Sequence, residues 1–286
     1  MTPRPQAAFI RSMLVGLDGS AEADAAVELA LRWAETTGAR LVGLAVVDEP
    51  SIRRGALVTP IAGYYPSQHG DERVIIAQRD RTGRLLSVLS RRCDSRGVRC
   101  ELLEETGSPH ERILHVAQAH DLVILPRSGQ FRFRVNGGHD DTVERVLRAS
   151  GRPVVTVPAA RPRSGPVVVA YDGGMHATRA LQALQSAGLE PFVETVVVSV
   201  RETEAEAARS AHQAYEYLTS HDVPVRVVVI ASTAPADESI TRVVDDVDAR
   251  LLVAGVSTRS PLAERLFGSV TRALLRTSPV PMFLSA

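Results

Sequence analysis

The chain has 286 residues, of which 44% are hydrophobic and 23% charged, and its formal net charge is zero. This length predicts about two domains with packed cores and polar surfaces. The neutral charge gives no electrostatic support for a nucleic-acid or acidic-membrane partner. Every basic residue is arginine. The missing lysine excludes a P-loop NTPase and Schiff-base chemistry.

The sequence has no signature of a membrane or secreted protein. No apolar run approaches the ~20 residues of a membrane span, and the N-terminal residues lack the apolar core of a signal peptide. Two cysteines, Cys93 and Cys100, do not make a secreted disulfide framework. We therefore expect a cytoplasmic protein.

The first half alternates strands and helices. Ser20 can cap a helix after the turn Asp18-Gly19, and Gly38 can end it. Ser108, followed by Pro109, is the expected N-cap of another helix. The predicted strands are 13–17, 40–47, 98–104, 121–125 and 153–157, and the predicted helices are 21–37, 72–96, one starting at Ser108 and 140–150.

A long stretch, residues 48–70, interrupts this alternation. It contains several prolines and glycines and is longer than most connections in compact domains. It is either a mobile cover near a site or a packing arm. The second interpretation is favoured because Ile61, Tyr64 and Tyr65 are apolar enough to dock.

The second half repeats this order after a linker at 159–166. GLDGS matches AYDGG, GSPHERIL matches TAPADESI, and DLVILPRSG matches RLLVAGVST. Such a repeat predicts two homologous units in tandem, each with a parallel sheet and right-handed crossovers. The predicted strands are 167–171, 194–200, 223–231, 251–254 and 280–284, and the predicted helices are 176–186, 202–220, 235–246 and one from Gly268 to about 277.

The C-terminal stretch contains a candidate anion site. Gly255 ends an apolar strand and lets a ligand approach the backbone. Gly268 and Ser269 open a helix and offer free N–H groups, a hydroxyl and the positive end of the helix dipole. Both features fall at the sheet edge where ligands bind in open α/β folds. Phosphate is the anion that best suits such a site.

These residues resemble a known pattern. Gly255, two residues, Thr258, nine residues and Gly268-Ser269 are similar to the nucleotide loop of universal stress proteins, G-x-x-G, nine residues, G-S/T. Thr258 departs from the pattern because the family has a second glycine there. The tail SVTRALLRTSPVPMFL also resembles the closing helix and strand of the family.

The resemblance covers nearly the whole chain and implies a fold. It implies two tandem flavodoxin-like, Rossmann-like α/β domains, 1–158 and 166–286. Each would contain a five-stranded parallel sheet of order 3-2-1-4-5 with helices on both faces. The last strand of each unit lies at an edge, and the resemblance implies that 153–157 and 280–284 pair antiparallel within the chain. The chain would then be a covalent version of the family homodimer. Whether two whole chains pair further is left open.

The resemblance also implies a nucleotide site. In the family, an aspartate after the first strand lies near adenine and ribose, a valine contacts adenine, and the glycine loop holds phosphates. Carried onto the second unit, the site comprises Ala170, Tyr171, Asp172, Val200, Gly255, Thr258, Gly268, Ser269 and Val270. The ligand would be ATP, or ADP or AMP, with Mg²⁺ as a companion. Arg259 and Arg265 could also reach phosphates. In the first unit a weaker set remains: Asp18, Val46 and Gly129.

The loop of the first unit is degenerate. Pro126 stands where the first glycine belongs and has no N–H to offer. Asp140 and Asp141 replace the Gly-Ser pair, and they repel a phosphate at the helix N-terminus. Gly137-Gly138 could form an anion-binding turn, but the adjacent aspartates argue against it. We therefore predict that the first site does not bind ATP well.

The expected function is that of an ATP-binding stress or regulatory protein that is not an enzyme. Two alternatives stay open: a nucleotide-independent interaction scaffold and a weak ATP hydrolase. An adenylating enzyme would need S-G-G-x-D-S, and a dinucleotide oxidoreductase G-x-G-x-x-G; Asp172-Gly173-Gly174 fits neither. No catalytic triad or metal-ligand spacing stands out in the sequence.

Overall fold

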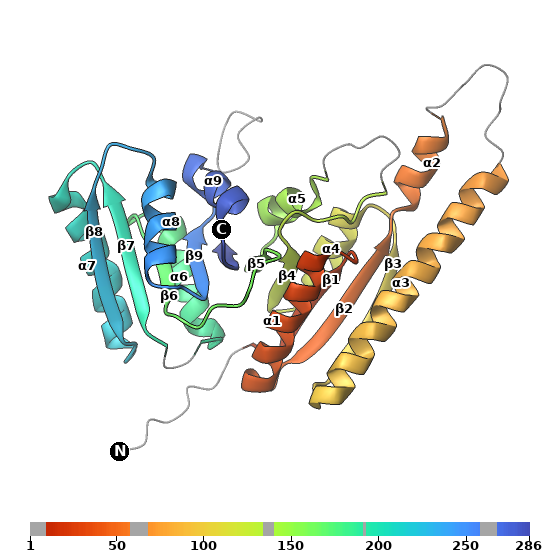
Figure 1. Cartoon of the computed structure of the whole chain (residues 1–286), viewed down its shortest axis with the longest axis horizontal. Coiled ribbons are helices and arrows are strands. Elements are labelled where there is room, and N and C mark those ends of the chain that lie inside the picture. The colour runs from red at the N-terminus through yellow and green to blue at the C-terminus, as the bar shows by residue number, and fades with distance from the viewer. Residues whose placement is uncertain (1–9, 58–67, 134–139, 191–192, 258–267) are drawn as a thin grey trace. The chain divides into compact units, whose positions relative to one another are not determined.

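The chain folds into two compact units. The computed structural model describes residues 10–57, 68–133, 140–190, 193–257 and 268–286. One unit is Arg11–Ala149, and the other contains Ser150–Ala286. Both are built from strands that alternate with helices (Figure 1). Among the described residues, no helix is long and apolar enough to cross a membrane.

The first unit contains a parallel sheet with helices on both faces. The strands lie in the order β3-β2-β1-β4, and each neighbouring pair is parallel. Helices α1 and α3 pack on one face, and α4 and α5 contact each other on the other face (Figure 1). The elements are β1 Ser12–Leu17, α1 Ala21–Thr37, β2 Arg40–Val47, α2 Glu49–Leu57, α3 Gln68–Arg96, β3 Cys100–Thr106, α4 Pro109–Ala117, β4 Leu122–Pro126 and α5 Thr142–Ala149.

The second unit has the predicted strand order. Strands β8-β7-β6-β9-β10 follow the order 3-2-1-4-5 and are all parallel. Helices α6 and α7 cover one face, and α8 and α9 the other (Figure 1). The elements are β5 Val154–Val157, β6 Val167–Ala170, α6 Met175–Ala187, β7 Thr195–Arg201, α7 Glu204–Ser220, β8 Val225–Ala231, α8 Ala236–Asp246, β9 Leu251–Gly255, α9 Ser269–Thr277 and β10 Met282–Ser285.

The two terminal strands pair within the chain, as predicted. β5 lies antiparallel to β10, with Thr156 opposite Met282 and Val154 opposite Leu284. Because of this pairing, β5 belongs to the same compact unit as β10. From the sequence, residues 153–157 were assigned to the first domain, which ends at 158. Grouping by contacts places the division after Ala149, so β5 is described with the second unit.

Local signals in the sequence explain most helix ends. The Ser20 hydroxyl accepts a hydrogen bond from the Ala23 N–H at 3.1 Å, and Gly38 ends α1 at φ 71°. Ser108 is the N-cap residue of α4 by position, but its hydroxyl does not cap the helix. It is hydrogen-bonded to His110 Nδ1 at 2.9 Å instead. The prediction that Ser108 is the N-cap residue is therefore confirmed, although its hydroxyl bonds to a nearby imidazole rather than to the helix backbone.

The interruption after β2 begins with a helix that the sequence analysis did not predict. Asp48 starts α2, its Oδ1 accepting a hydrogen bond from Ser51 N–H at 3.2 Å. Ile52 is buried in a small cluster with Val47 and Ile75. Residues 49–57 therefore act as a packing element. The expected docking residues Ile61, Tyr64 and Tyr65 lie outside the described residues.

Candidate functional site

A cavity lies at the carboxyl ends of the strands in the second unit. Strands β6 and β9 are neighbours, and the helices that follow them, α6 and α9, cover opposite faces of the sheet. Ligands in open α/β sheets bind at this kind of switch point. The cavity has a volume of about 390 Å³, within the usual range for small-molecule sites.

The structure brings together all but one of the residues predicted for this site. The cavity is lined by Ala170, Tyr171, Asp172, Val200, Gly255, Gly268, Ser269 and Val270. Thr258 lies outside the described residues, as do Arg259 and Arg265.

Asp172 lies at the cavity immediately after β6. Its side chain is exposed, and its Oδ1 accepts a hydrogen bond from Gly174 N–H at 2.8 Å. Its carbonyl oxygen accepts hydrogen bonds from the guanidinium of Arg201 and, at 3.3 Å, from the Ser210 hydroxyl. Contacts from β7 and α7 thus fix the backbone that carries this carboxylate.

The N-terminus of α9 faces the same cavity. Gly268 is the N-cap residue and has no side chain with which to cap the helix. The first N–H groups of a helix have no partner within the helix, so Ser269 and Val270 present backbone donors at the positive end of the helix dipole. The Thr271 hydroxyl donates to the Gly255 carbonyl at 3.1 Å and ties this end of α9 to β9.

Gly255 is required by close packing of the protein backbone. A Cβ atom at this position would lie 2.4 Å from the His176 carbonyl carbon and 2.6 Å from Ala177 N. From the sequence, Gly255 is expected to let a ligand approach the backbone. In the structure, the missing side chain of Gly255 makes room for the first turn of α6.

Several cavity residues were not found from the sequence. Ala236 and Ile240 of α8 and Leu274 of α9 add apolar wall, and Arg201, His176 and Ser257 add polar groups. The spacing of Ala236 and Ile240 indicates that they lie on one face of a helix. It does not indicate that this face lines the cavity. Arg201 directly follows Val200, which was predicted for the site, and this neighbourhood in the sequence is the signal that could have indicated Arg201 as a cavity residue.

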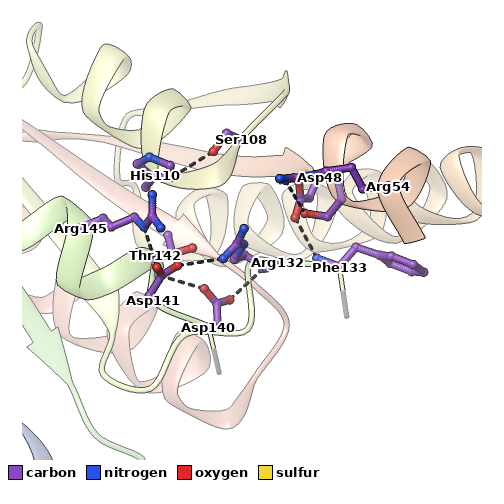
Figure 2. A network of polar contacts seen from close by, with 11 residues as sticks. Asp48, Arg54, Ser108, His110, Arg132, Phe133, Asp140, Asp141, Thr142 and Arg145 are labelled. Atoms are coloured by element: carbon purple, nitrogen blue, oxygen red, sulfur yellow. Dashed lines mark hydrogen bonds and ion pairs between the residues drawn. The ribbon is translucent and has the colours of Figure 1, made fainter. Parts of the chain in front are cut away.

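The equivalent loop of the first unit, which follows β4, binds carboxylates of its own chain. Gln130 N–H donates to Asp18 Oδ2 at 2.5 Å, and Ser128 N–H donates to Glu22 Oε2 at 2.6 Å. Figure 2 shows two further bonds: Arg132 N–H donates to Asp140 at 2.8 Å, and Phe133 N–H donates to Asp48 at 3.1 Å. Four backbone donors in the described part of this loop are thus already satisfied. Gly137 and Gly138 lie outside the described residues.

The N-terminus of α5 is likewise occupied by protein carboxylates. Asp140 is buried, and its Oδ1 accepts a hydrogen bond from Thr142 N–H at 3.0 Å. Asp141 pairs with Arg145 at 2.6 Å and with Arg132 at 3.0 Å (Figure 2). Burial raises the pKa of Asp141, but its hydrogen bond with Arg145 and the charges of both arginines outweigh this and hold the pKa below its ordinary value. The negative charge therefore persists at neutral pH.

The weaker predicted residues of the first unit are buried or enclosed. Asp18 is 5% exposed and Val46 is 8% exposed. Gly129, at φ 49°, lies against Phe131, and a Cβ atom at Gly16 would lie 2.9 Å from the ring of Phe131. Gly16 corresponds to Ala170, which lines the cavity in the second unit. In the first unit, this space holds a buried phenylalanine.

The fold and the cavity define a doubly wound α/β protein with a cavity at its switch point. The model of the universal stress protein family matches residues 10–158 and 164–285. The chain therefore belongs to the universal stress protein family, with two family segments in tandem.

Individual relatives agree with this assignment. The chain is 22% identical over 182 residues to universal stress protein Slr1230 of Synechocystis sp., in an alignment covering 64% of this chain and 63% of that protein. A universal stress protein structure from Archaeoglobus fulgidus has a TM-score of 0.66 at 17% identity and covers 96% of this chain and 97% of that one. A functionally unknown protein from Pseudomonas aeruginosa has a TM-score of 0.61 at 18% identity, covering 98% and 94%. At these identities the structures show the fold alone.

Proposed function

We propose that the second unit binds one adenine nucleotide, ATP or its products ADP or AMP, and that the chain acts as a nucleotide-binding regulatory protein of the stress response. One observation carries this proposal. A single cavity joins a helix N-terminus whose N-cap residue is glycine, an exposed carboxylate and an apolar wall. These three features suit the three parts of a nucleotide.

Each part of the nucleotide has a matching surface. Phosphates suit the N-terminus of α9 at Ser269 and Val270, where backbone donors and the helix dipole favour an anion. The Asp172 carboxylate can accept hydrogen bonds from ribose hydroxyls. Val200 and Ile240 offer apolar contact to a base. The pattern of the family loop in the sequence supports the same assignment.

Magnesium would enter with the nucleotide. Among the described residues, no group of three or more histidine, cysteine or acidic side chains could hold a metal ion. Mg²⁺ commonly binds through substrate phosphates and water rather than in an all-protein cage. The chain's own contribution would then be to hold the phosphates.

The first unit is proposed not to bind nucleotide. Its loop donors already bind Asp18, Glu22, Asp48 and Asp140. We therefore expect one nucleotide per chain. Calorimetric titration with ATP, ADP and AMP measures this number and ranks the three ligands. Two equivalent sites per chain would contradict the proposal.

The variant Gly268→Asp tests the position of the phosphates. A Cβ atom at Gly268 meets none of the described residues within 4 Å, and aspartate is a favoured N-cap residue, so the fold should be kept. The new carboxylate would occupy the anion site, as Asp140 does in the first unit. We expect ATP affinity to fall by at least about 100-fold, the scale of several kcal/mol for like charges in a partly buried site. Gly268→Ala is the matched control and should bind ATP within a few-fold of wild type. Unchanged affinity of Gly268→Asp would refute this placement.

Two further measurements separate the other candidate roles. Adenine nucleotide that co-purifies with the chain, detected by mass spectrometry, favours a binding protein over a nucleotide-independent scaffold. Long incubation with ATP tests turnover, and we expect no ADP above the buffer control.

The edge of β10 is covered by β5, so this strand needs no second chain to pair with it.

A further inference from the structure

The two units differ at the second residue of the helix that follows the first strand. In the first unit this residue is Glu22, in a helix capped by Ser20. In the second unit it is His176, in a helix whose N-cap residue is Gly174. The two residues are equivalent by position, but one is an acid and the other an imidazole.

In the first unit, Glu22 closes the loop after β4. Its Oε2 accepts a hydrogen bond from Ser128 N–H at 2.6 Å, and its Oε1 accepts one from the Ser128 hydroxyl at 3.3 Å. Arg127 adds an ion pair at 3.6 Å. The side chain of Glu22 is only 13% exposed, so these contacts are partly shielded from water. The carboxylate therefore serves as the anion for this part of the loop.

In the second unit, the equivalent residues face the cavity. Ser257 lies two residues beyond β9, just as Ser128 lies two residues beyond β4. Both Ser257 and His176 line the cavity. The Nδ1 atom of His176 is buried, and in the described part of the chain it has no hydrogen-bond partner. A buried polar atom without a partner is costly, and rotation of the imidazole toward a ligand in the cavity would supply the missing partner.

We propose that His176 is a ligand-binding residue, whose imidazole donates a hydrogen bond to a phosphate oxygen of the bound nucleotide. This inference rests on the function proposed above and adds a residue to that site. The phosphate would occupy in the second unit the place that the Glu22 carboxylate takes in the first. The residue at this position then contributes, together with Asp18 and Asp140 in the first unit, to which anion the loop binds: a carboxylate of its own chain or a phosphate from solution.

The absence of a negatively charged side chain at position 176 would explain why the second loop binds a phosphate rather than a carboxylate of its own chain. A glutamate at 176 would place a negative charge beside the phosphates and would compete for the same loop donors, as Glu22 does for Ser128. Among the described residues, the aspartate and arginine side chains that line the cavity are Asp172 and Arg201. The guanidinium of Arg201 is already bonded to the Asp172 carbonyl. The imidazole of His176 takes no part in that bond, and among the described residues its Nδ1 atom has no hydrogen-bond partner. His176 is therefore available as an additional polar group for the phosphate.

The test compares ATP with adenosine, which lacks phosphates. Each ligand is titrated calorimetrically into wild type and into His176→Ala, His176→Gln and His176→Glu. Loss of a hydrogen bond to a charged group should weaken ATP binding by His176→Ala roughly tenfold or more. His176→Gln keeps a donor and should stay within a few-fold of wild type, whereas His176→Glu should lose at least about 100-fold. Adenosine affinity should be the same in all four proteins.

A control in the first unit checks the specificity of the effect. Glu22→Gln changes the equivalent position and should leave ATP affinity and stoichiometry unchanged, because Asp18 and Asp140 still occupy the first loop. Far-UV circular dichroism confirms folding, and if His176→Glu does not fold, the alanine and glutamine variants give the answer.

The outcomes separate the two proposals. If wild type binds no nucleotide, the proposed function fails and this inference fails with it. If wild type binds ATP and His176→Ala and His176→Glu bind it equally well, the inference alone is wrong. Equal losses for ATP and adenosine would also overturn it, because His176 would then only shape the cavity.

Discussion

The substitution Gly255→Ala tests whether close backbone packing at the end of β9 holds the cavity together. The new Cβ atom would lie 2.4 Å from the His176 carbonyl carbon and 2.7 Å from its oxygen. Real Cβ contacts essentially never fall below 3.0 Å, and these neighbours are backbone atoms that no rotamer change can move. The first turn of α6 must shift by several tenths of an ångström or more.

The expected cost follows from this geometry. Overpacking by a single methyl group typically costs about 1–3 kcal/mol, and a rigid backbone neighbour favours the upper part of that range. With a urea m-value of about 1–3 kcal/mol per molar, a loss of about 2 kcal/mol lowers the unfolding midpoint by roughly 1 M. The shift of α6 should also weaken ATP binding, because His176 and Gly174 line the cavity.

Gly268→Ala is the matched control for this measurement. Gly268 belongs to the same loop pattern, but in the part of the chain that the structure describes a Cβ atom there meets nothing within 4 Å. Its φ of −55° suits any residue. Urea unfolding followed by far-UV circular dichroism should therefore show a large loss for Gly255→Ala and a small change for Gly268→Ala. Equal midpoints for the two variants would refute the reasoning.

Two further predictions concern the first unit. Phe131→Ala should cost about 3–5 kcal/mol in urea unfolding without creating an ATP site, because the carboxylates still occupy the loop; a second binding event in calorimetry would contradict this. Burial raises the pKa of Glu28, but hydrogen bonds and charges from Arg96 and Arg92 outweigh it and hold the pKa below its ordinary value. This contribution is present above the unfolded-state pKa of about 4.3 and is lost as the pH falls through the lower folded-state pKa. Glu28→Gln should therefore be less stable than wild type near pH 7 by under about 1 kcal/mol, given the exposure of the pair, and the difference should vanish in acid; a constant difference across pH would refute it.

The sequence predicted those parts of the fold that depend on local signals. Helix α1 has its predicted bounds because Ser20 and Gly38 cap it. The strand predicted at 98–104 is observed at Cys100–Thr106, since its ends are set by pairing with β2, where Thr106 lies opposite Val47. The sequence does not predict helix α2 because Pro50 and Gly55 are typical loop residues, although Asp48 is a good N-cap residue.

The candidate site was predictable only where residues belong to one continuous pattern. Gly255, Gly268 and Ser269 were found from their spacing, and Asp172 from its place after a strand. His176 and Arg201 carry no pattern of their own. They reach the cavity because β6, β7 and β9 are adjacent in the sheet, which is a property of the tertiary structure.

The two loops use the same physical chemistry with different anions. A helix N-terminus and the loop before it present donors that must be satisfied by a side chain, by water or by a ligand. In the first unit, Asp140 and Glu22 supply that partner from within the chain, so these donors are satisfied without a ligand. In the second unit, Gly268 provides no side chain and His176 provides no negative charge at the equivalent positions, and under the proposed function a phosphate takes the place of the two carboxylates. On this proposal, degeneration of the first loop is a replacement of the anion rather than a loss of structure.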